Sequence, residues 1–146
     1  MTLRAEPARP HDLAGALDLL RRSELPEQDV AERWGHYFVV REDDGRVIAV
    51  AGLEVHGADG LLRGVAVDPD YRRQGLAAAL VAEVISRAKL LELRAVYLLT
   101  TTARDYFARL GFRVRAREEA PPAIRASWEF RSGCPATAVF MSRPVA

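Results

Sequence analysis

The sequence has a single cysteine, Cys134, among its 146 residues. One thiol excludes an intrachain disulfide, and it excludes a metal site built from several cysteines. The three histidines, His11, His36 and His56, do not have the spacing of metal ligands, so we expect no metal. We expect Cys134 to pack as a small buried apolar side chain. The alternative is a nucleophilic or ligand-binding thiol, although no histidine lies near it in the sequence.

The sequence also lacks a large net charge and a long apolar run. Its 21 basic and 20 acidic residues give a net charge of +1, which argues against a nucleic-acid or membrane-surface partner. The longest apolar candidate, 76–91, contains Glu83, Arg87 and Lys89 and falls short of the roughly 20 apolar residues of a membrane span. The first residues contain no apolar signal core. We therefore expect a cytoplasmic protein.

The composition, 49% hydrophobic and 28% charged, is typical of a globular protein, and we expect one α/β domain over 1–146. Apolar, β-branched runs predict strands at 2–5, 37–41, 47–54, 61–67, 95–99, 112–115 and 136–143. Helical periodicity and end signals predict helices at 12–22, 28–34, 75–91 and 103–110, with Asp12 and Thr102 as N-caps and a helical turn within 121–128. The long helix is a crossover, so the strand at 95–99 should run parallel to the one at 61–67.

A basic turn joins the strand at 61–67 to the long helix. Residues 72–77 read Arg-Arg-Gln-Gly-Leu-Ala. The first amides of a helix have no partner within the helix, and Gly75 has no Cβ to keep a ligand away from them. Arg72 and Arg73 beside these amides suit a diphosphate. The alternative is an ordinary strand–helix connection with a solvated arginine pair.

The order of these elements, with Arg-X-X-Gly-X-Ala at the start of the long helix, resembles the GNAT family of acyl-CoA-dependent N-acyltransferases. The resemblance covers essentially the whole chain. The motif is matched by Arg72, Gly75 and Ala77. A second family motif, Ala-X-X-aromatic-aromatic-X-X-X-Gly-Phe, is matched by Ala103, Tyr106, Phe107, Gly111 and Phe112.

The resemblance implies a GNAT fold: a mixed, mostly antiparallel sheet of about seven strands, splayed between 61–67 and 95–99 and flanked by about four helices. It implies acetyl-CoA as the acyl donor and no metal. The cofactor-binding residues would be Val65, Ala66 and Val67 for the pantetheine arm, Arg72, Arg73, Gln74, Gly75, Leu76 and Ala77 for the diphosphate, and Thr100 and Phe107 along the arm.

A closer resemblance is to GNAT proteins associated with arsenic resistance. It rests on Gly-Leu-Glu at 52–54, Leu-Leu-Arg at 61–63, the run at 97–103, Pro-X-Ala-Ile at 121–124 and Cys-Pro-Ala-Thr-Ala at 134–138. This resemblance implies acetylation of a small-molecule amine, an acidic or toxic amino acid of the arsenic-resistance or phosphinothricin-like type. The alternatives are acetylation of a protein N-terminus or lysine, and a non-catalytic acyl-CoA-binding regulator. The resemblance also allows for a homodimer formed through the late strands.

Acyl transfer to an amine needs a base, and Glu54 is our candidate. It lies at the end of an apolar strand, where desolvation would raise the pKa of its carboxyl group. The alternative is a solvent-facing carboxylate. Tyr106 is the candidate acid, but the family's acid tyrosine falls at Phe107, and one helical step rotates a side chain by about 100°. The alternative is that Tyr106 packs or lines the pocket and water protonates the leaving thiolate.

Two arginines are candidates for binding a substrate anion. Arg63 lies inside an otherwise apolar strand, two residues before Val65, and should share the face of Val65. Arg125 lies on a loop that could cover the site, and its alternative is a solvated loop arginine.

Overall fold

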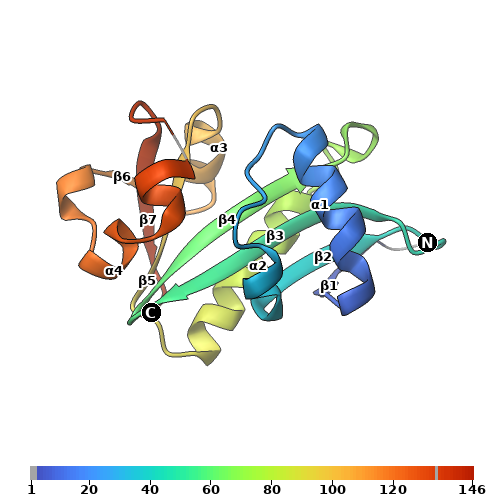
Figure 1. Cartoon of the computed structure of the whole chain (residues 1–146), viewed down its shortest axis with the longest axis horizontal. Coiled ribbons are helices and arrows are strands. Elements are labelled where there is room, and N and C mark those ends of the chain that lie inside the picture. The colour runs from blue at the N-terminus through green and yellow to red at the C-terminus, as the bar shows by residue number, and fades with distance from the viewer. Residues whose placement is uncertain (1–2, 134) are drawn as a thin grey trace. The chain divides into compact units, whose positions relative to one another are not determined.

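The computed structural model describes residues 3–133 and 135–146, so Cys134 lies outside the described residues. Seven strands form one open sheet in the order β1-β2-β3-β4-β5-β7-β6 (Figure 1). The strands are β1 (Ala5–Pro7), β2 (Tyr37–Arg41), β3 (Val47–His56), β4 (Asp59–Val67), β5 (Ala95–Thr100), β6 (Arg113–Arg115) and β7 (Val139–Pro144). The α-helices are α1 (Leu13–Arg22), α2 (Leu76–Leu90), α3 (Arg104–Arg109) and α4 (Pro122–Arg125).

Shorter helical turns complete the chain. They are the 3-10 helices η1 (Pro10–Asp12), η2 (Ala31–His36), η3 (Pro69–Tyr71) and η4 (Arg117–Glu119), and the π-helix η5 (Glu129–Gly133). Strands β1 and β2, β2 and β3, β5 and β7, and β6 and β7 pair antiparallel, whereas β4 and β5 pair parallel through Gly60–Val96 and Leu61–Tyr97. The mixed, mostly antiparallel sheet and the fold class expected from the sequence are confirmed.

The chain divides into two compact units. The first comprises Met1–Glu54 and Leu62–Arg87, and the second comprises Val55–Leu61 and Ala88–Ala146. The expectation of a single domain over 1–146 stays a prediction.

Helices α1 and α2 belong largely to the first unit and pack on opposite faces of its strands. Ala16, Leu19 and Leu20 of α1 are fully buried in a cluster that includes Tyr37 and Val39 of β2. Side chains alternate across a strand, so Phe38, between these two, points to the other face. There the Arg87 guanidinium of α2 lies 5.1 Å from the centroid of the Phe38 ring. Figure 1 shows α1 in front of these strands.

The ring of Tyr37 occupies space that two glycines leave open. Gly52 is its direct cross-strand partner, and a Cβ on Gly52 would lie 2.2 Å from the Tyr37 ring. A Cβ on Gly64 would lie 3.7 Å from the same ring. On its other side Tyr37 stacks on Trp34, with ring centroids 5.2 Å apart. The aromatic ring therefore covers bare backbone and joins η2 to the sheet.

The second unit has its own core around β5 and β7. Tyr97 stacks on Phe140 with centroids 5.3 Å apart, and Phe130 meets Phe140 edge to face at 5.5 Å. Asp59 is buried and accepts a hydrogen bond from Arg94 at 2.8 Å. Burial, and then the negative charge of Asp59, raise the pKa of the Tyr97 phenol.

Three local expectations from the sequence are wrong. The first strand is Ala5–Pro7 rather than 2–5, and of the predicted range Thr2 lies outside the described residues. Thr102 does not cap α3, whose N-cap is Ala103. The helix at 28–34 is instead the 3-10 turn η2, which is kinked at Arg33, where φ is −113° and ψ is 19°.

Asp12 is the N-cap residue of α1, as the sequence predicts, but its side chain makes no capping hydrogen bond to that helix. Its buried carboxylate accepts the Arg9 N–H at 2.8 Å and a hydrogen bond from Arg41 at 2.7 Å. Burial acts to raise the pKa of Asp12, but the hydrogen bonds from Arg41 and Arg9 outweigh it and hold the pKa below its usual value. The residue therefore anchors the first turn to β2.

Replacing Gly52 by alanine should destabilise the fold, because its Cβ would collide with the ring of Tyr37. We expect the free energy of unfolding to fall by about 1–3 kcal/mol, measured by urea denaturation. Gly35→Ala is the matched control, since a Cβ at Gly35 meets no atom within 4 Å. Equal losses in the two variants would show that the Tyr37 contact is not what Gly52 provides.

The stability of the first unit should depend on the protonation of His36. Burial, and then the nearby Arg87, lower the pKa of His36. Arg87 Nη1 lies 2.8 Å from His36 Nδ1, which fits a neutral ring that accepts the hydrogen bond. His36 therefore binds a proton more tightly in the unfolded chain than in the folded one. The stability that the neutral His36 ring provides is present above pH ~6.5 and is lost as the pH falls below that value.

We therefore expect the loss of unfolding free energy between pH 7 and pH 5 to be smaller in His36→Gln than in the parent chain. Urea denaturation at both pH values measures it. An unchanged pH dependence in His36→Gln would contradict this assignment.

Candidate functional site

Asp68 fixes the turn after β4 to the rest of the first unit. Its N–H donates to Ile48 O at 2.8 Å, and its Oδ1 accepts the Asp70 N–H at 3.0 Å. The Asp68 side chain is 6% exposed, and its Oδ2 lies 3.4 Å from Arg46 Nη1 and 3.6 Å from Arg22 Nη1. These contacts hold the start of the 72–77 turn in place.

Two left-handed residues shape the backbone between η3 and α2. Arg73 has a φ of +64° and Gly75 a φ of +78°. The left-handed conformation costs a residue other than glycine about 1–2 kcal/mol, so the surrounding turn must impose it on Arg73. The hydrogen bond from Ala79 N–H to Gly75 O, at 3.0 Å, opens α2. The amides at 76–78 therefore have no acceptor within the helix.

The turn is open to solvent on the side where these amides lie. Arg72, Arg73, Gln74 and Gly75 are exposed, and a Cβ at Gly75 would meet no atom within 4 Å. Arg72 Nε donates to Val67 O at 3.3 Å, which keeps its guanidinium beside the end of β4. Left-handed residues next to a helix start form a concave set of N–H donors that suits an anion. The structure thus brings the predicted residues 72–77 together in one anion-binding geometry.

Glu54 of β3 and Arg63 of β4 form a buried ion pair. Arg63 Nη1 donates to Glu54 Oε2 at 2.6 Å, and both residues are 2% exposed. Arg63 Nη2 lies within hydrogen-bond distance of Pro26 O, at 3.4 Å, in the segment after α1. The sequence placed a base candidate and an anion-binding candidate nine residues apart, and the fold makes them partners. Glu54 is not solvent-facing, so the alternative reading of Glu54 is wrong.

Gly64 has a left-handed backbone conformation within β4. Its φ of +63° is typical of a β-bulge, which places two consecutive residues on one face. A Cβ at Gly64 would point at Leu20 of α1, 3.4 Å away, and Arg63 contacts Pro26 on that same side. The expectation that Arg63 shares the face of Val65 assumed a regular strand, and it stays a prediction.

Arg33 of η2 is a residue that the sequence did not single out. Its Nε lies 3.9 Å from Glu54 Oε1, on the carboxylate oxygen that does not receive the short Arg63 hydrogen bond. The Arg33 side chain is 37% exposed. Only the packing of η2 against β3 reveals this proximity, since 21 positions separate the two residues and no motif connects them.

The predicted residues of the second unit lie at the end of β5 and on α3. Thr100 Oγ1 accepts the Ala103 N–H at 3.0 Å, so it supports the bend between the two elements. Phe107 is 7% exposed and meets Phe112 edge to face at 5.9 Å. Tyr106 is half-buried, and the Arg109 guanidinium lies 5.8 Å from the centroid of its ring. Roles of Thr100, Tyr106 and Phe107 toward a ligand stay predictions.

Arg125 holds its own loop together. Its Nη2 donates to Glu118 O and to Ala120 O, both at 3.0 Å. These two bonds tie α4 to the turn before it. A role for Arg125 in binding a substrate anion stays a prediction.

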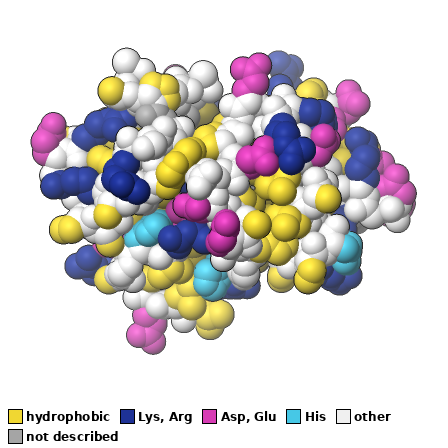
Figure 2. Space-filling view, viewed as in Figure 1, with side chains coloured by type: hydrophobic (Ala, Val, Ile, Leu, Met, Phe, Trp, Pro, Cys, Tyr) yellow, Lys and Arg dark blue, Asp and Glu magenta, His cyan; other side chains and the backbone are white. Residues whose placement is uncertain are grey.

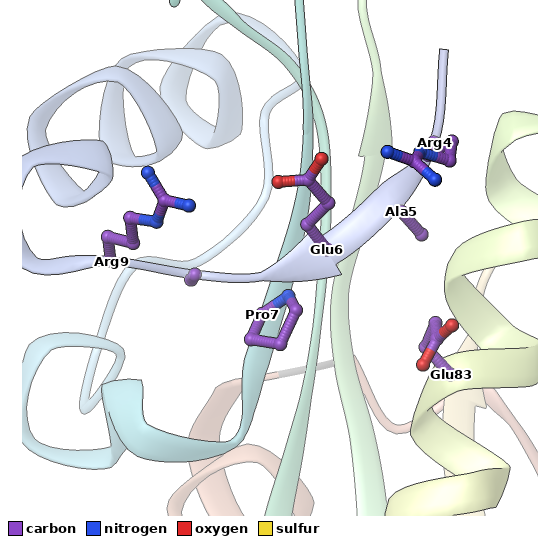
Figure 3. Close-up of a pocket in the computed structure, with 7 residues that line it drawn as sticks. Arg4, Ala5, Glu6, Pro7, Arg9 and Glu83 are labelled. Carbon is purple, nitrogen blue, oxygen red and sulfur yellow. The ribbon is translucent and has the colours of Figure 1, made fainter. Parts of the chain in front are cut away.

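An open hollow of about 510 Å³ lies beside the edge strand β1. Figure 3 shows Glu6 on β1 between Arg4 and Arg9, with Glu83 on α2 across the hollow. Glu6 is already paired with Arg41 at 2.7 Å. The lining is of mixed charge and includes no residue that the sequence predicts for the site.

Charges are also mixed on the surface, since Figure 2 shows acidic side chains beside basic ones on the face that it draws. Within 3–133 and 135–146, no cluster of three or more His, Cys, Asp or Glu side chains is suited to a metal ion. Among the same residues, no helix has the length and apolar character needed to cross a membrane.

Comparison with known proteins places these features in a family. Residues 6–112 match the model of the acetyltransferase (GNAT) family. An amino-acid acetyltransferase of Azotobacter vinelandii is 36% identical over 124 residues, which cover 80% of this chain and 28% of the relative. One of Pseudomonas aeruginosa is 30% identical over 128 residues, covering 82% of this chain and 30% of the relative. The chain thus matches less than a third of the length of these curated relatives.

Solved structures agree in fold. The N-acetylglutamate synthase of Neisseria gonorrhoeae, complexed with coenzyme A and N-acetyl-glutamate, superposes with a TM-score of 0.86 at 19% identity over 100% of this chain and 36% of that one. A Mycobacterium tuberculosis protein in complex with CoA gives 0.81 at 22% identity, covering 96% of this chain and 98% of that one. With its sheet order, its glycine turn before α2 and the match over 6–112, the chain belongs to the acetyltransferase (GNAT) family.

Proposed function

We propose that the chain transfers the acetyl group of acetyl-CoA to the amine of an amino acid that carries an acidic group. The observation that carries the proposal is the open, left-handed turn at 72–77, which offers free amides and two exposed arginines to a diphosphate. Family membership and the names of the amino-acid acetyltransferase relatives support it.

The donor would lie along β4 and the turn that follows it. The diphosphate would bind the amides and arginines of 72–77, and the pantetheine arm would follow the backbone of 65–67. A strand rises about 3.3 Å per residue, so the four steps from Arg63 to Val67 span roughly 13 Å. An arm that runs back from the turn therefore brings its thioester toward the Arg63 end of β4, where Glu54 lies.

The reaction forms a bond between the amine nitrogen and the acetyl carbonyl carbon, and it breaks the carbon–sulfur bond. Glu54 would take the amine proton, directly or through one water. The leaving thiolate would take a proton from water, since Phe107 stands where the family carries an acid tyrosine and a thiol leaves readily at neutral pH. Tyr106 would line the site rather than replace that tyrosine.

The acceptor's acidic group would be bound by an arginine. Arg63 and Arg125 are the two that the sequence proposes for this role. Phosphinate and arsonate groups are anionic like a carboxylate, so phosphinothricin-like and arsenical amino acids belong to the same proposed acceptor class.

Gly75→Ala should weaken acetyl-CoA binding, because the new Cβ would stand where the diphosphate meets the amides. The turn would also lose about 0.4–1 kcal/mol or more of stability, since alanine is strained at a φ of +78°. We expect the parent chain to show a thermal shift with acetyl-CoA, and the variant to need about tenfold more ligand for the same shift.

Gly45→Ala is the matched control for Gly75→Ala. Gly45 also has a left-handed φ, +91°, and also has open space at its Cβ, but it lies in the turn between β2 and β3. It should share the loss of stability and keep the acetyl-CoA shift. A parent chain that gives no shift, or two variants with the same shift, would remove the turn from donor binding.

Glu54→Gln should lower kcat by about 10²–10⁴-fold, because glutamine cannot accept the amine proton. Release of free thiol with an amino-acid acceptor measures the rate, and thermal melting shows how much folded enzyme is present. Asp59→Asn is the control, because Asp59 is an equally buried carboxylate paired with an arginine, in the second unit. We expect it to lose stability but to keep kcat within about threefold. A Glu54→Gln variant that turns over as fast as the parent would exclude Glu54 as the base.

A further inference from the structure

We infer that Arg33 binds the anionic group of the acceptor and so determines that the enzyme prefers carboxylate-bearing amines. The inference rests on the function proposed above and deepens it, because it assigns acceptor recognition to a residue that no motif indicates. It starts from the two charges that flank Glu54.

The charge of Arg63 is already neutralised within the protein. Its guanidinium donates to Glu54 at 2.6 Å, lies within reach of Pro26 O, and is buried with only 2% of the residue exposed. A buried arginine that is paired in this way would have to break an ion pair before it could bind a ligand carboxylate, and leaving Glu54 without its partner would be costly. Arg63 is therefore better suited to holding Glu54 in place than to binding the acceptor.

Arg33 is less tightly paired than Arg63 and more exposed to solvent. Its Nε is 3.9 Å from Glu54 Oε1, which is beyond hydrogen-bond distance, and 37% of its side chain is exposed. The partly exposed positive charge of Arg33 attracts an anion. A planar guanidinium with exposed N–H groups matches a carboxylate in a two-point contact.

The backbone around Arg33 is held in position, so its side chain starts from a defined point. The neighbouring Trp34 donates from its indole Nε1 to Arg9 O at 2.9 Å and stacks on Tyr37. Val30, at the other side, is fully buried. Arg33 itself sits at the kink of η2, where the helical conformation is interrupted. A fixed backbone reduces the entropy lost when the side chain binds a ligand.

This placement predicts how the acceptor lies. Glu54 accepts a proton from the acceptor's amine. Arg33, which lies beside Glu54 Oε1, binds an anionic group of the acceptor. An amine and an anion a few bonds apart would then span Glu54 and Arg33. An amine with no anionic group would gain nothing from Arg33.

The test compares three amines in the thiol-release assay: L-glutamate, 4-aminobutyrate, which lacks the α-carboxylate, and propylamine, which lacks both carboxylates. For Arg33→Gln we expect the KM of L-glutamate to rise by about 10- to 100-fold while its kcat changes by less than about threefold. The kcat/KM for propylamine should stay within about twofold. Arg33→Lys should fall between the parent and Arg33→Gln, because lysine keeps the charge and loses the two-point contact.

The comparison with 4-aminobutyrate shows which carboxylate Arg33 binds. If Arg33→Gln raises KM for L-glutamate but not for 4-aminobutyrate, Arg33 binds the α-carboxylate; if it raises both, Arg33 binds the side-chain group. Either result supports the inference. Arg4→Gln, an exposed arginine beside β1, is the control and should change no KM.

An Arg33→Gln variant that keeps the parent's preference for L-glutamate over propylamine would overturn the inference and leave the proposed acetyl transfer standing. So would a parent chain that acetylates propylamine as well as L-glutamate. A parent chain that releases no thiol with any amine overturns the proposed function, and the inference with it.

Discussion

The buried ion pair between Glu54 and Arg63 is the interaction on which the first unit depends. Taking both charges out of water is costly, and removing one partner of such a pair typically costs about 3–5 kcal/mol. The pair joins β3 to β4, and the contact of Arg63 with Pro26 O adds the segment after α1. The same interaction thus keeps in place, inside the fold, the carboxylate that we propose as the base for acyl transfer.

Glycine makes this arrangement sterically possible. Gly64, next to Arg63, has a left-handed φ that favours glycine, and Gly52 leaves room for the ring of Tyr37. That ring stacks on Trp34 and so holds η2 against the sheet, which brings Arg33 to within 3.9 Å of Glu54. A third glycine, Gly75, opens the turn that we propose for the diphosphate. The proposed donor and acceptor sites therefore both depend on positions where a side chain would be strained or would collide.

Much of the fold could be predicted from the sequence, because strands and long helices follow from local hydrophobic patterns. The turn at 72–77 could be found for the same reason, since its glycine, its arginines and its helix start are consecutive. The ion pair could not, because it depends on how β3 and β4 lie side by side, and Gly64, next to Arg63, has a left-handed φ that a regular strand would not have. The contact of Arg33 with Glu54 is even harder to predict from the sequence, because it depends on how η2 packs against the sheet. The hydrogen bonds between Asp12 and Arg41 could not be predicted either, because 29 positions separate the two residues.

The most direct test is a crystal structure of the chain with CoA and an N-acetylated acidic amino acid. We expect the diphosphate oxygens to lie within hydrogen-bond distance of amides between Arg72 and Ala77. We expect the amide nitrogen of the product near Glu54 and its carboxylate on the Arg33 guanidinium, with the Glu54–Arg63 pair unbroken. A product carboxylate bound elsewhere, with Arg33 turned to solvent, would contradict the account.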